Sequence, residues 1–221
     1  MKTRTAERRV LPSQALLSCP VIAVLRAGGA TDYAPVVETL AEAGIRSIEL
    51  TLSTPGTLDC FDKLRSSIPD DTEIGVGTVT SVVQALAAIE AGADFLVTPV
   101  TDPAIVEASA AATVPIYPGG LTPTELHAGW AAGATAVKLF PASTVGPAYI
   151  GQLNGPFPGM HIVPSGGIEI DHIGSWMAAG ALAVSLGGPL IGDAFKGGSL
   201  NALKERASRA VEISLEGRAQ P

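Results

Sequence analysis

Ala136-Val137-Lys138-Leu139-Phe140-Pro141 is a short apolar stretch with a single lysine near its centre. Its composition predicts a buried strand, in which valine or isoleucine would be expected at position 138. A buried and unpaired ammonium costs on the order of several kcal/mol unless it loses its proton or gains a partner. Either the protein uses this amine chemically, or Lys138 lies at a strand end and extends to solvent.

The stretch around Lys138 belongs to a regular alternation of strands and helices. The expected strands cover residues 21–25, 47–52, 73–79, 95–99, 115–119, 136–141, 161–167 and 183–188. The expected helices cover residues 31–43, 57–66, 81–91, 170–179 and 200–215, and three more begin near residues 102, 122 and 146. About eight strands alternating with about eight helices predict an α/β fold, a (β/α)8 TIM barrel forming one domain over residues 1–221.

The alternative architecture is a doubly wound open sheet. Its strands would not nearly all end in Gly, Pro, Thr or a charged residue, as most do here. Residues of these types are typical of the C-terminal mouth of a barrel, where the loops build the active site. The barrel is therefore favoured over the open sheet.

The N-terminal segment contains four basic residues and then a mildly apolar stretch, which is reminiscent of a signal peptide. Pro12 and Pro20 interrupt that stretch, and no convincing cleavage site follows. We expect a disordered tail over residues 1–9 and a short helix over residues 10–18.

Charge and cysteine content narrow the functional classes. The net charge of −7 argues against a general nucleic-acid binder, which needs clustered Lys and Arg. No apolar run approaches the length of a membrane span. The two cysteines, Cys19 and Cys60, have no motif spacing, which suits a reduced compartment. We therefore expect a cytoplasmic protein that binds neither nucleic acid nor membrane.

The alternation of side chains along a strand brings polar groups into the expected barrel. Glu49, Thr51 and Ser53 share one face of their strand, and the apolar residues between them should pack against helices. By the same parity Lys138 and Phe140 point inward. Arg26 and Thr78 also lie at or near strand C-termini, so that these groups converge at one mouth. The structural alternative is an ion pair between Glu49 and Lys138 that only neutralises both charges.

Two glycine-rich turns close the seventh and eighth strands. Ser165-Gly166-Gly167 and Gly187-Gly188 lie where barrels often bind phosphate with backbone N–H groups. A single Gly-Gly pair is weak evidence of such a site, and two pairs at these strands are stronger.

The histidines and tryptophans are expected to be structural. His127, His161 and His172 are scattered and lack the spacing of metal ligands, so no metal or cofactor is expected. Trp130 and Trp176 lie in expected helices and should contribute to packing.

Five motifs together resemble a known family. They are Ile22-Ala23-Val24-Leu25-Arg26, Glu49-Leu50-Thr51-Leu52, Gly75-Val76-Gly77-Thr78-Val79, Lys138-Leu139-Phe140-Pro141 and Pro164-Ser165-Gly166-Gly167-Ile168. In this order and spacing they resemble the 2-keto-3-deoxy-6-phosphogluconate aldolases, a family that also includes 4-hydroxy-2-oxoglutarate and phosphogalactonate aldolases. The resemblance covers about residues 15 to 215.

The resemblance implies a metal-free, class I aldolase that is usually a homotrimer. Lys138 would form the Schiff base with the substrate, and Glu49 would act as general acid and base. Pyruvate and a phosphorylated 2-keto-3-deoxy sugar acid would be its small-molecule partners. The residues implied to bind the substrate are Arg26, Ser53, Thr78, Pro99, Phe140, Ser165, Gly166, Gly167, Gly187 and Gly188.

The chain departs from the family pattern at two positions. Several members have arginine where this chain has Ser53, and a serine hydroxyl near the phosphate where this chain has Gly188. Both positions bear on the sugar-acid stereochemistry and on the phosphate requirement. Cleavage of 2-keto-3-deoxy-6-phosphogluconate to pyruvate and glyceraldehyde 3-phosphate ranks narrowly ahead of the galactonate and hydroxyoxoglutarate reactions.

Two functions of other classes stay open at this point. A sugar-phosphate isomerase or epimerase would keep the anion site and use Glu49 or Lys138 for proton transfer without an imine. A non-catalytic assembly subunit would have no need of the polar groups, so the presence of Glu49, Thr78 and Lys138 argues against it.

Overall fold

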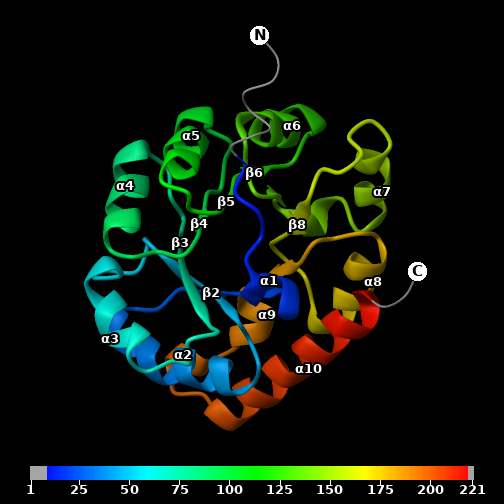
Figure 1. Cartoon of the computed structure of the whole chain (residues 1–221). Helices are drawn as coiled ribbons and strands as arrows, with labels where there is room; N and C mark the ends of the chain where they lie inside the picture. The colour runs from blue at the N-terminus through cyan, green and yellow to red at the C-terminus, as the bar shows by residue number, and fades with distance from the viewer. Residues whose placement is uncertain (1–8, 219–221) are drawn as a thin grey trace.

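The computed structural model describes residues 9–218, in which helices surround a curled parallel sheet (Figure 1). The strands are β1 (Val21–Leu25), β2 (Ser47–Thr51), β3 (Glu73–Gly77), β4 (Leu96–Val97), β5 (Ile116–Tyr117), β6 (Gly119–Gly120), β7 (Val137–Leu139), β8 (Ile162–Pro164) and β9 (Val184–Leu186). The expected strand–helix alternation is confirmed over this part of the chain.

The α-helices follow the strands around the outside. They are α1 (Gln14–Ser18), α2 (Tyr33–Glu42), α3 (Phe61–Arg65), α4 (Val82–Glu90), α5 (Pro103–Ala111), α6 (Pro123–Ala132), α7 (Ala148–Asn154), α8 (Ile173–Ala178), α9 (Gly188–Ile191) and α10 (Leu200–Arg218). Short 3-10 turns are η2 (Ala30–Asp32), η3 (Leu58–Cys60), η4 (Ala142–Thr144), η5 (Ile170–His172) and η6 (Ala194–Lys196).

The strands pair in parallel in two sheets. One sheet has the order β5-β4-β3-β2-β1-β9, and the other has the order β6-β7-β8. Further backbone contacts connect the two sheets. Ser165 and Ser185 form a parallel bridge, and the Leu182 N–H donates to the Ile162 carbonyl at 2.8 Å. On the other side, β5 and β6 are separated only by Pro118.

The buried side chains form an inner and an outer core. The inner core packs between the strands and consists of Leu16, Ile22, Phe95, Val97, Tyr117, Ala136, Val163 and Ala183. The outer core joins alternate strand residues such as Ile48, Leu50 and Val137 to the surrounding helices. This separation confirms the parity expected for β2 and β7, since neighbouring strand residues point to opposite faces.

Polar residues and glycine define where the helices begin and end. The Ser81 hydroxyl accepts a hydrogen bond from the Gln84 N–H at the start of α4. Thr122 and Glu125 form a reciprocal capping box at the start of α6, and Gly133 ends this helix with a φ of 108°. Such caps satisfy backbone groups that have no partner within the helix.

The structure corrects the expected N-terminal helix. The helix expected over residues 10–18 spans only Gln14–Ser18, because the Ser13 hydroxyl caps its first turn by accepting from the Leu16 N–H. Residues 1–8 of the expected tail lie outside the described part. Arg9 is described, and its guanidinium donates to the carbonyls of Trp130 and Ala134 and stacks on the Trp130 ring.

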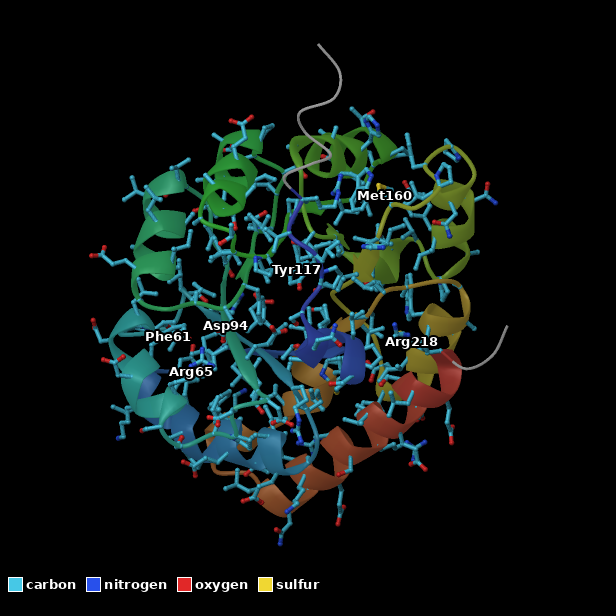
Figure 2. The ribbon with its side chains drawn as sticks, in the orientation of Figure 1. Phe61, Arg65, Asp94, Tyr117, Met160 and Arg218 are labelled. Atoms are coloured by element: carbon cyan, nitrogen blue, oxygen red, sulfur yellow. The ribbon has the colours of Figure 1, made fainter. Side chains whose placement is uncertain are left out.

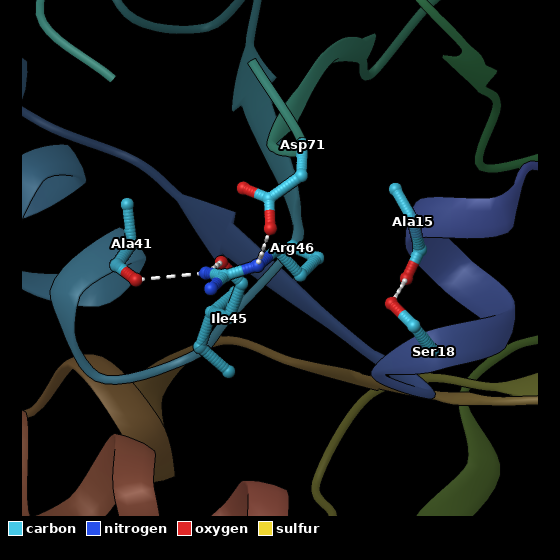
Figure 3. A network of polar contacts seen from close by, with 6 residues as sticks. All are labelled: Ala15, Ser18, Ala41, Ile45, Arg46 and Asp71. Carbon is cyan, nitrogen blue, oxygen red and sulfur yellow. Dashed lines mark hydrogen bonds and ion pairs between the residues drawn. The ribbon is translucent and has the colours of Figure 1, made fainter. Parts of the chain in front are cut away.

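Ion pairs gather where strands begin. Arg46, just before β2, pairs with Asp71 at 2.9 Å and also donates to the Ala41 carbonyl at 2.8 Å (Figure 3). Arg65 and Asp94 point toward each other and form a second pair (Figure 2). Pairs this exposed contribute at most about 1 kcal/mol each, so they support this end of the molecule only modestly.

None of the helices within residues 9–218 combines the length and the apolarity that crossing a membrane would require.

Candidate active site

A cavity of about 210 Å³ lies at the C-terminal ends of the strands. The strands and the loops that follow them supply its walls. The lining residues are Val24, Arg26, Glu49, Thr51, Thr78, Pro99, Lys138, Phe140, Ser165, Gly166, Gly167, Ile168, Ser185, Gly187, Gly188 and Pro189. Side chains far apart in the sequence thus meet at one mouth, as the strand parity predicted.

Lys138 extends from β7 into this cavity. Its side chain is only 9% exposed, and its Nζ lies 5.0 Å from the centre of the Phe140 ring. Within residues 9–218 it takes part in none of the ion pairs, which all involve other residues. Lys138 is therefore not a solvent-exposed strand end, within residues 9–218 no direct ion pair joins it to Glu49, and it lines the cavity.

Glu49 extends into the same cavity from β2. The residue is 1% exposed, and within the described part of the chain nothing donates a hydrogen bond to Oε2. Burial raises the pKa of its carboxyl, and the nearby charges of Lys138 and Arg26 oppose that rise. A carboxyl with a raised pKa is suited to exchange protons with a bound substrate near neutral pH.

The cavity brings together most of the residues that the sequence indicated. Among the expected substrate-binding residues it includes Arg26, Thr78, Pro99, Phe140, Ser165, Gly166, Gly167, Gly187 and Gly188. Ser53 is the exception. It is exposed and lies outside the lining, because β2 ends at Thr51 and the chain turns. The Ser53 hydroxyl instead donates to the Thr51 hydroxyl at 3.1 Å.

Five lining residues were not singled out from the sequence: Val24, Thr51, Ile168, Ser185 and Pro189. Ser185 has the clearest role, because its hydroxyl accepts a hydrogen bond from that of Ser165 at 3.2 Å. Its inward parity on β9, two residues before Gly187, was a usable signal. Thr51 shares the parity of Glu49 and was placed inward without being assigned a role.

The two glycine turns differ in what they tolerate. Gly166 and Gly167 have φ values of 90° and 71°, a region that favours glycine. A Cβ on Gly167 would also lie 2.6 Å from the Ser143 hydroxyl. A Cβ on Gly188 would have no neighbour within 4 Å, and its φ is not positive. Gly166 and Gly167 therefore require glycine for their backbone conformation, whereas Gly188 does not.

Hollows of about 420 and 490 Å³ lie elsewhere on the surface, and they do not bring Glu49 and Lys138 together. The histidines lie outside the cavity lining, and His127 stacks on Phe157 at 4.8 Å between ring centres. In the part of the chain that the structure describes, no group of three or more His, Cys, Asp or Glu residues is placed to hold a metal ion. The cavity brings one buried amine, that of Lys138, together with one buried carboxyl, that of Glu49.

Comparison with known proteins is consistent with this arrangement. The family model described as KDPG and KHG aldolase matches residues 13–205. The chain is 35% identical over 159 residues to a 2-dehydro-3-deoxy-phosphogluconate aldolase of Haemophilus influenzae, covering 72% of this chain and 74% of the relative. It is 33% identical over 172 residues to a probable 2-dehydro-3-deoxy-6-phosphogalactonate aldolase of Rhizobium meliloti, covering 77% of this chain and 81% of the relative.

A solved structure extends the likeness to three dimensions. It is a KDPG aldolase from Legionella pneumophila with pyruvate captured at low pH as a covalent carbinolamine intermediate. The TM-score is 0.75 at 27% identity, and the match covers 91% of this chain and 95% of that one.

Proposed function

Because the chain belongs to the KDPG and KHG aldolase family and is a carbon–carbon lyase, we propose that it cleaves 2-keto-3-deoxy-6-phosphogluconate through a Schiff base on Lys138. The products are pyruvate and glyceraldehyde 3-phosphate. The observation on which this proposal rests is the buried amine of Lys138, which forms no ion pair within residues 9–218, in one cavity with the buried carboxyl of Glu49.

The first step is the attack of the neutral Lys138 amine on the C2 ketone of the substrate. The resulting carbinolamine loses water and becomes a protonated imine, which can accept an electron pair. The covalent carbinolamine described for the Legionella protein is a species of this kind, and it supports the same route here.

Glu49 then transfers protons at two points. As a base it removes the proton of the C4 hydroxyl, the C3–C4 bond breaks, and its electron pair moves into the imine to give an enamine. Glyceraldehyde 3-phosphate leaves. As an acid Glu49 returns the proton to C3, and water hydrolyses the imine to release pyruvate and restore the Lys138 amine. The raised pKa of Glu49 suits a group that alternates between both forms.

The other cavity residues hold the substrate in this proposal. Arg26 and Thr78 bind the pyruvyl carboxylate and neighbouring oxygens, and Pro99 and Phe140 border the pyruvyl group. Backbone N–H groups of Gly166, Gly167, Gly187 and Gly188, with the Ser165 hydroxyl, form the phosphate side. Ser53, whose hydroxyl donates to Thr51 outside the cavity lining, would reach only a part of the substrate that extends beyond the cavity.

A second reaction of the same class is favoured by one feature. Ser53 replaces the arginine that several family members have, and the Rhizobium relative is a probable phosphogalactonate aldolase. Incubating the protein separately with each C4 epimer of the phosphorylated sugar acid, and with 4-hydroxy-2-oxoglutarate, ranks the three substrates by the kcat/KM for pyruvate release. Faster turnover of the galactonate epimer would make that epimer the assigned substrate, and the proposed Schiff-base mechanism would stay the same.

The fold and assembly enter the same proposal. We propose that the sheet closes into a (β/α)8 barrel, supported by the Ser165–Ser185 bridge between β8 and β9.

A cytoplasmic homotrimer is the proposed form of the protein. The trimer is supported by exposed apolar side chains, since Val83 and Leu86 on α4 are 77 and 52% exposed and Val100 in the loop after β4 is 55% exposed. Light scattering after size exclusion measures the trimer directly.

Trapping of the imine tests the central step. Pyruvate with borohydride should leave a stable adduct on Lys138, found by peptide mapping, and Lys138→Ala should fold but neither label nor turn over. Lys63→Ala is the matched control, since Lys63 lies outside the cavity lining and should label and react as the wild type. A label on another lysine, or no label, would overturn the Schiff-base mechanism.

A further inference from the structure

Gly77, on β3, faces the Glu49 carboxyl at very short range. A Cβ built on Gly77 would lie 2.0 Å from Oε1 of Glu49 and 2.6 Å from its Cδ. Contacts under 3.0 Å essentially never occur for a real Cβ. The Glu49 carboxyl therefore occupies the volume that any side chain at position 77 would need.

The backbone conformation does not explain a glycine at this position. Gly77 is the last residue of β3, pairs with Thr51 of β2, and does not have a positive φ. An alanine could adopt the same strand conformation. Space for the neighbouring carboxyl is the requirement that remains.

The strand register shows in which direction Glu49 extends. Glu49 is paired with Gly75, and Gly77 lies two residues further toward the C-terminal end of β3. The side chain thus slants toward the cavity mouth instead of lying level with its own backbone. The space beside Gly75 is already filled by the Phe95 ring, which would lie 2.3 Å from a Cβ there. Phe95 is fully buried and belongs to the inner core.

The Glu49 carboxyl is packed against Gly77 on one side and lacks a hydrogen bond at Oε2 within the described residues. In residues 9–218 Oε2 has no hydrogen-bond partner, while Cγ, Cδ and Oε1 all lie against Gly77. A general acid and base must be held within hydrogen-bond reach of its proton, so a displaced carboxyl loses its function even when its chemistry is intact.

We infer that Gly77 is a positioning residue for Glu49, whose missing side chain provides the space that directs the carboxyl toward the substrate. The inference rests on the proposed role of Glu49 in proton transfer. The inference predicts that substitutions at positions 49 and 77 affect each other through steric contact. It predicts no such coupling between positions 49 and 75.

The coupling is measured by making Gly77→Ala in the wild type and in Glu49→Ala, which lacks the atoms that the new Cβ would meet. Positioned proton transfer contributes ~10²–10⁴-fold to a reaction rate. In the wild type, Gly77→Ala should remove most of that contribution from kcat and leave KM little changed. In the Glu49→Ala background it should change the residual kcat by less than about twofold.

Gly75→Ala is the matched control, because its Cβ would meet Phe95 instead of Glu49. Its effect on kcat and on unfolding should be the same in both backgrounds. An equal loss from Gly77→Ala in both backgrounds, or no loss in the wild type, would overturn the inference. If Gly77→Ala alone does not fold, Gly77→Ala with Glu49→Ala should fold as Glu49→Ala does, and failure of the double variant would also overturn it.

Pyruvate trapping separates this inference from the proposed function. Gly77→Ala should still form the borohydride-stable adduct on Lys138, because the amine is untouched. An absence of the adduct in the wild type refutes the Schiff-base proposal. The coupling in unfolding free energy between positions 49 and 77 would still decide whether the two residues are in steric contact.

Discussion

The hydroxyl of Ser165 donates a hydrogen bond to the hydroxyl of Ser185 at 3.2 Å, and both serines line the cavity. The two residues are also bridged through their backbones, so the contact connects the ends of β8 and β9. Ser165 and Ser185 are 5% and 3% exposed. A buried hydroxyl pair at the join of two strands both stabilises the site wall and fixes the direction of the Ser165 hydroxyl.

Ser185→Ala should therefore lower the unfolding free energy by about 1 kcal/mol, the usual net value of a hydrogen bond. In a protein of this size that corresponds to a fall in Tm of roughly 2–4 °C. Denaturant titration of Ser165→Ala, Ser185→Ala and the double variant measures the loss of unfolding free energy. The two losses should be less than additive, and strict additivity would mean that the hydroxyls act independently.

Glu49→Gln should stabilise the protein at neutral pH while lowering its turnover. Burial raises the pKa of the Glu49 carboxyl above its ordinary value of 4.5. The folded state therefore binds more protons than the unfolded state, and the wild type loses stability as the pH rises from the unfolded value through the folded one. Each pKa unit of elevation corresponds to about 1.4 kcal/mol.

The stability difference between Glu49→Gln and the wild type should accordingly shrink as the pH falls toward 4.5. Chemical denaturation at several pH values gives this difference directly. Glu42→Gln is the control, since the Glu42 side chain is 66% exposed and pairs with Lys204 on the surface. Its stability should stay within about 0.5 kcal/mol of the wild type. A wild type more stable than Glu49→Gln at neutral pH would contradict the argument.

Gly188→Ser should increase the preference for a phosphorylated substrate. The site accepts a Cβ without contact within 4 Å, so the new side chain introduces no strain. A hydroxyl bonded to phosphate is worth roughly 1.5–3 kcal/mol, or about tenfold to hundredfold in binding. The ratio of kcat/KM for the phosphorylated and unphosphorylated sugar acids measures the change. Gly188→Ala adds the same Cβ without the hydroxyl, and equal ratios for the two variants would exclude a phosphate contact at this position.

Exhaustive chelation should leave the turnover rate unchanged. In the proposed mechanism the protonated imine on Lys138 accepts the electron pair of the broken bond, a role that a divalent ion performs in metal-dependent aldolases. Activity after dialysis against EDTA, compared with the same sample after Mg²⁺ or Zn²⁺ is restored, measures the dependence. A loss of activity on chelation, with recovery when metal is added, would show that a bound metal ion and not the imine accepts the electron pair.

Much of the fold could be predicted from local sequence. The strand expected over residues 21–25 matches β1 at both ends, and the inward parity of Glu49 and Lys138 holds. These features depend on apolar runs and on alternation within one strand, which are visible in the chain itself. The expected strand over residues 115–119 is split at Pro118, which has no N–H to donate.

The parts of the site that the sequence did not indicate depend on contacts beyond the alternation within one strand. Alternation was extended to Ser53, but β2 ends at Thr51, whose carbonyl accepts from the Thr57 hydroxyl in the following turn. The parity of Ser185 on β9 indicated that its side chain points inward, but its hydrogen bond depends on Ser165, which follows the neighbouring strand β8. The need for glycine at position 77 likewise arises from a carboxyl 28 residues earlier in the chain, at Glu49. Local composition cannot reveal such pairs.

The inner core below Lys138, which Leu16 of α1 joins, has a consequence for the order in which products leave. In the proposed mechanism the pyruvyl half stays covalently bound to Lys138, so the aldehyde half departs first. Free pyruvate then meets an empty enzyme and competes with the sugar acid, whereas the aldehyde encounters only the enamine and drives carbon–carbon bond formation. In the proposed mechanism the concentrations of pyruvate and aldehyde, relative to that of the sugar acid, therefore decide whether the protein cleaves or synthesises.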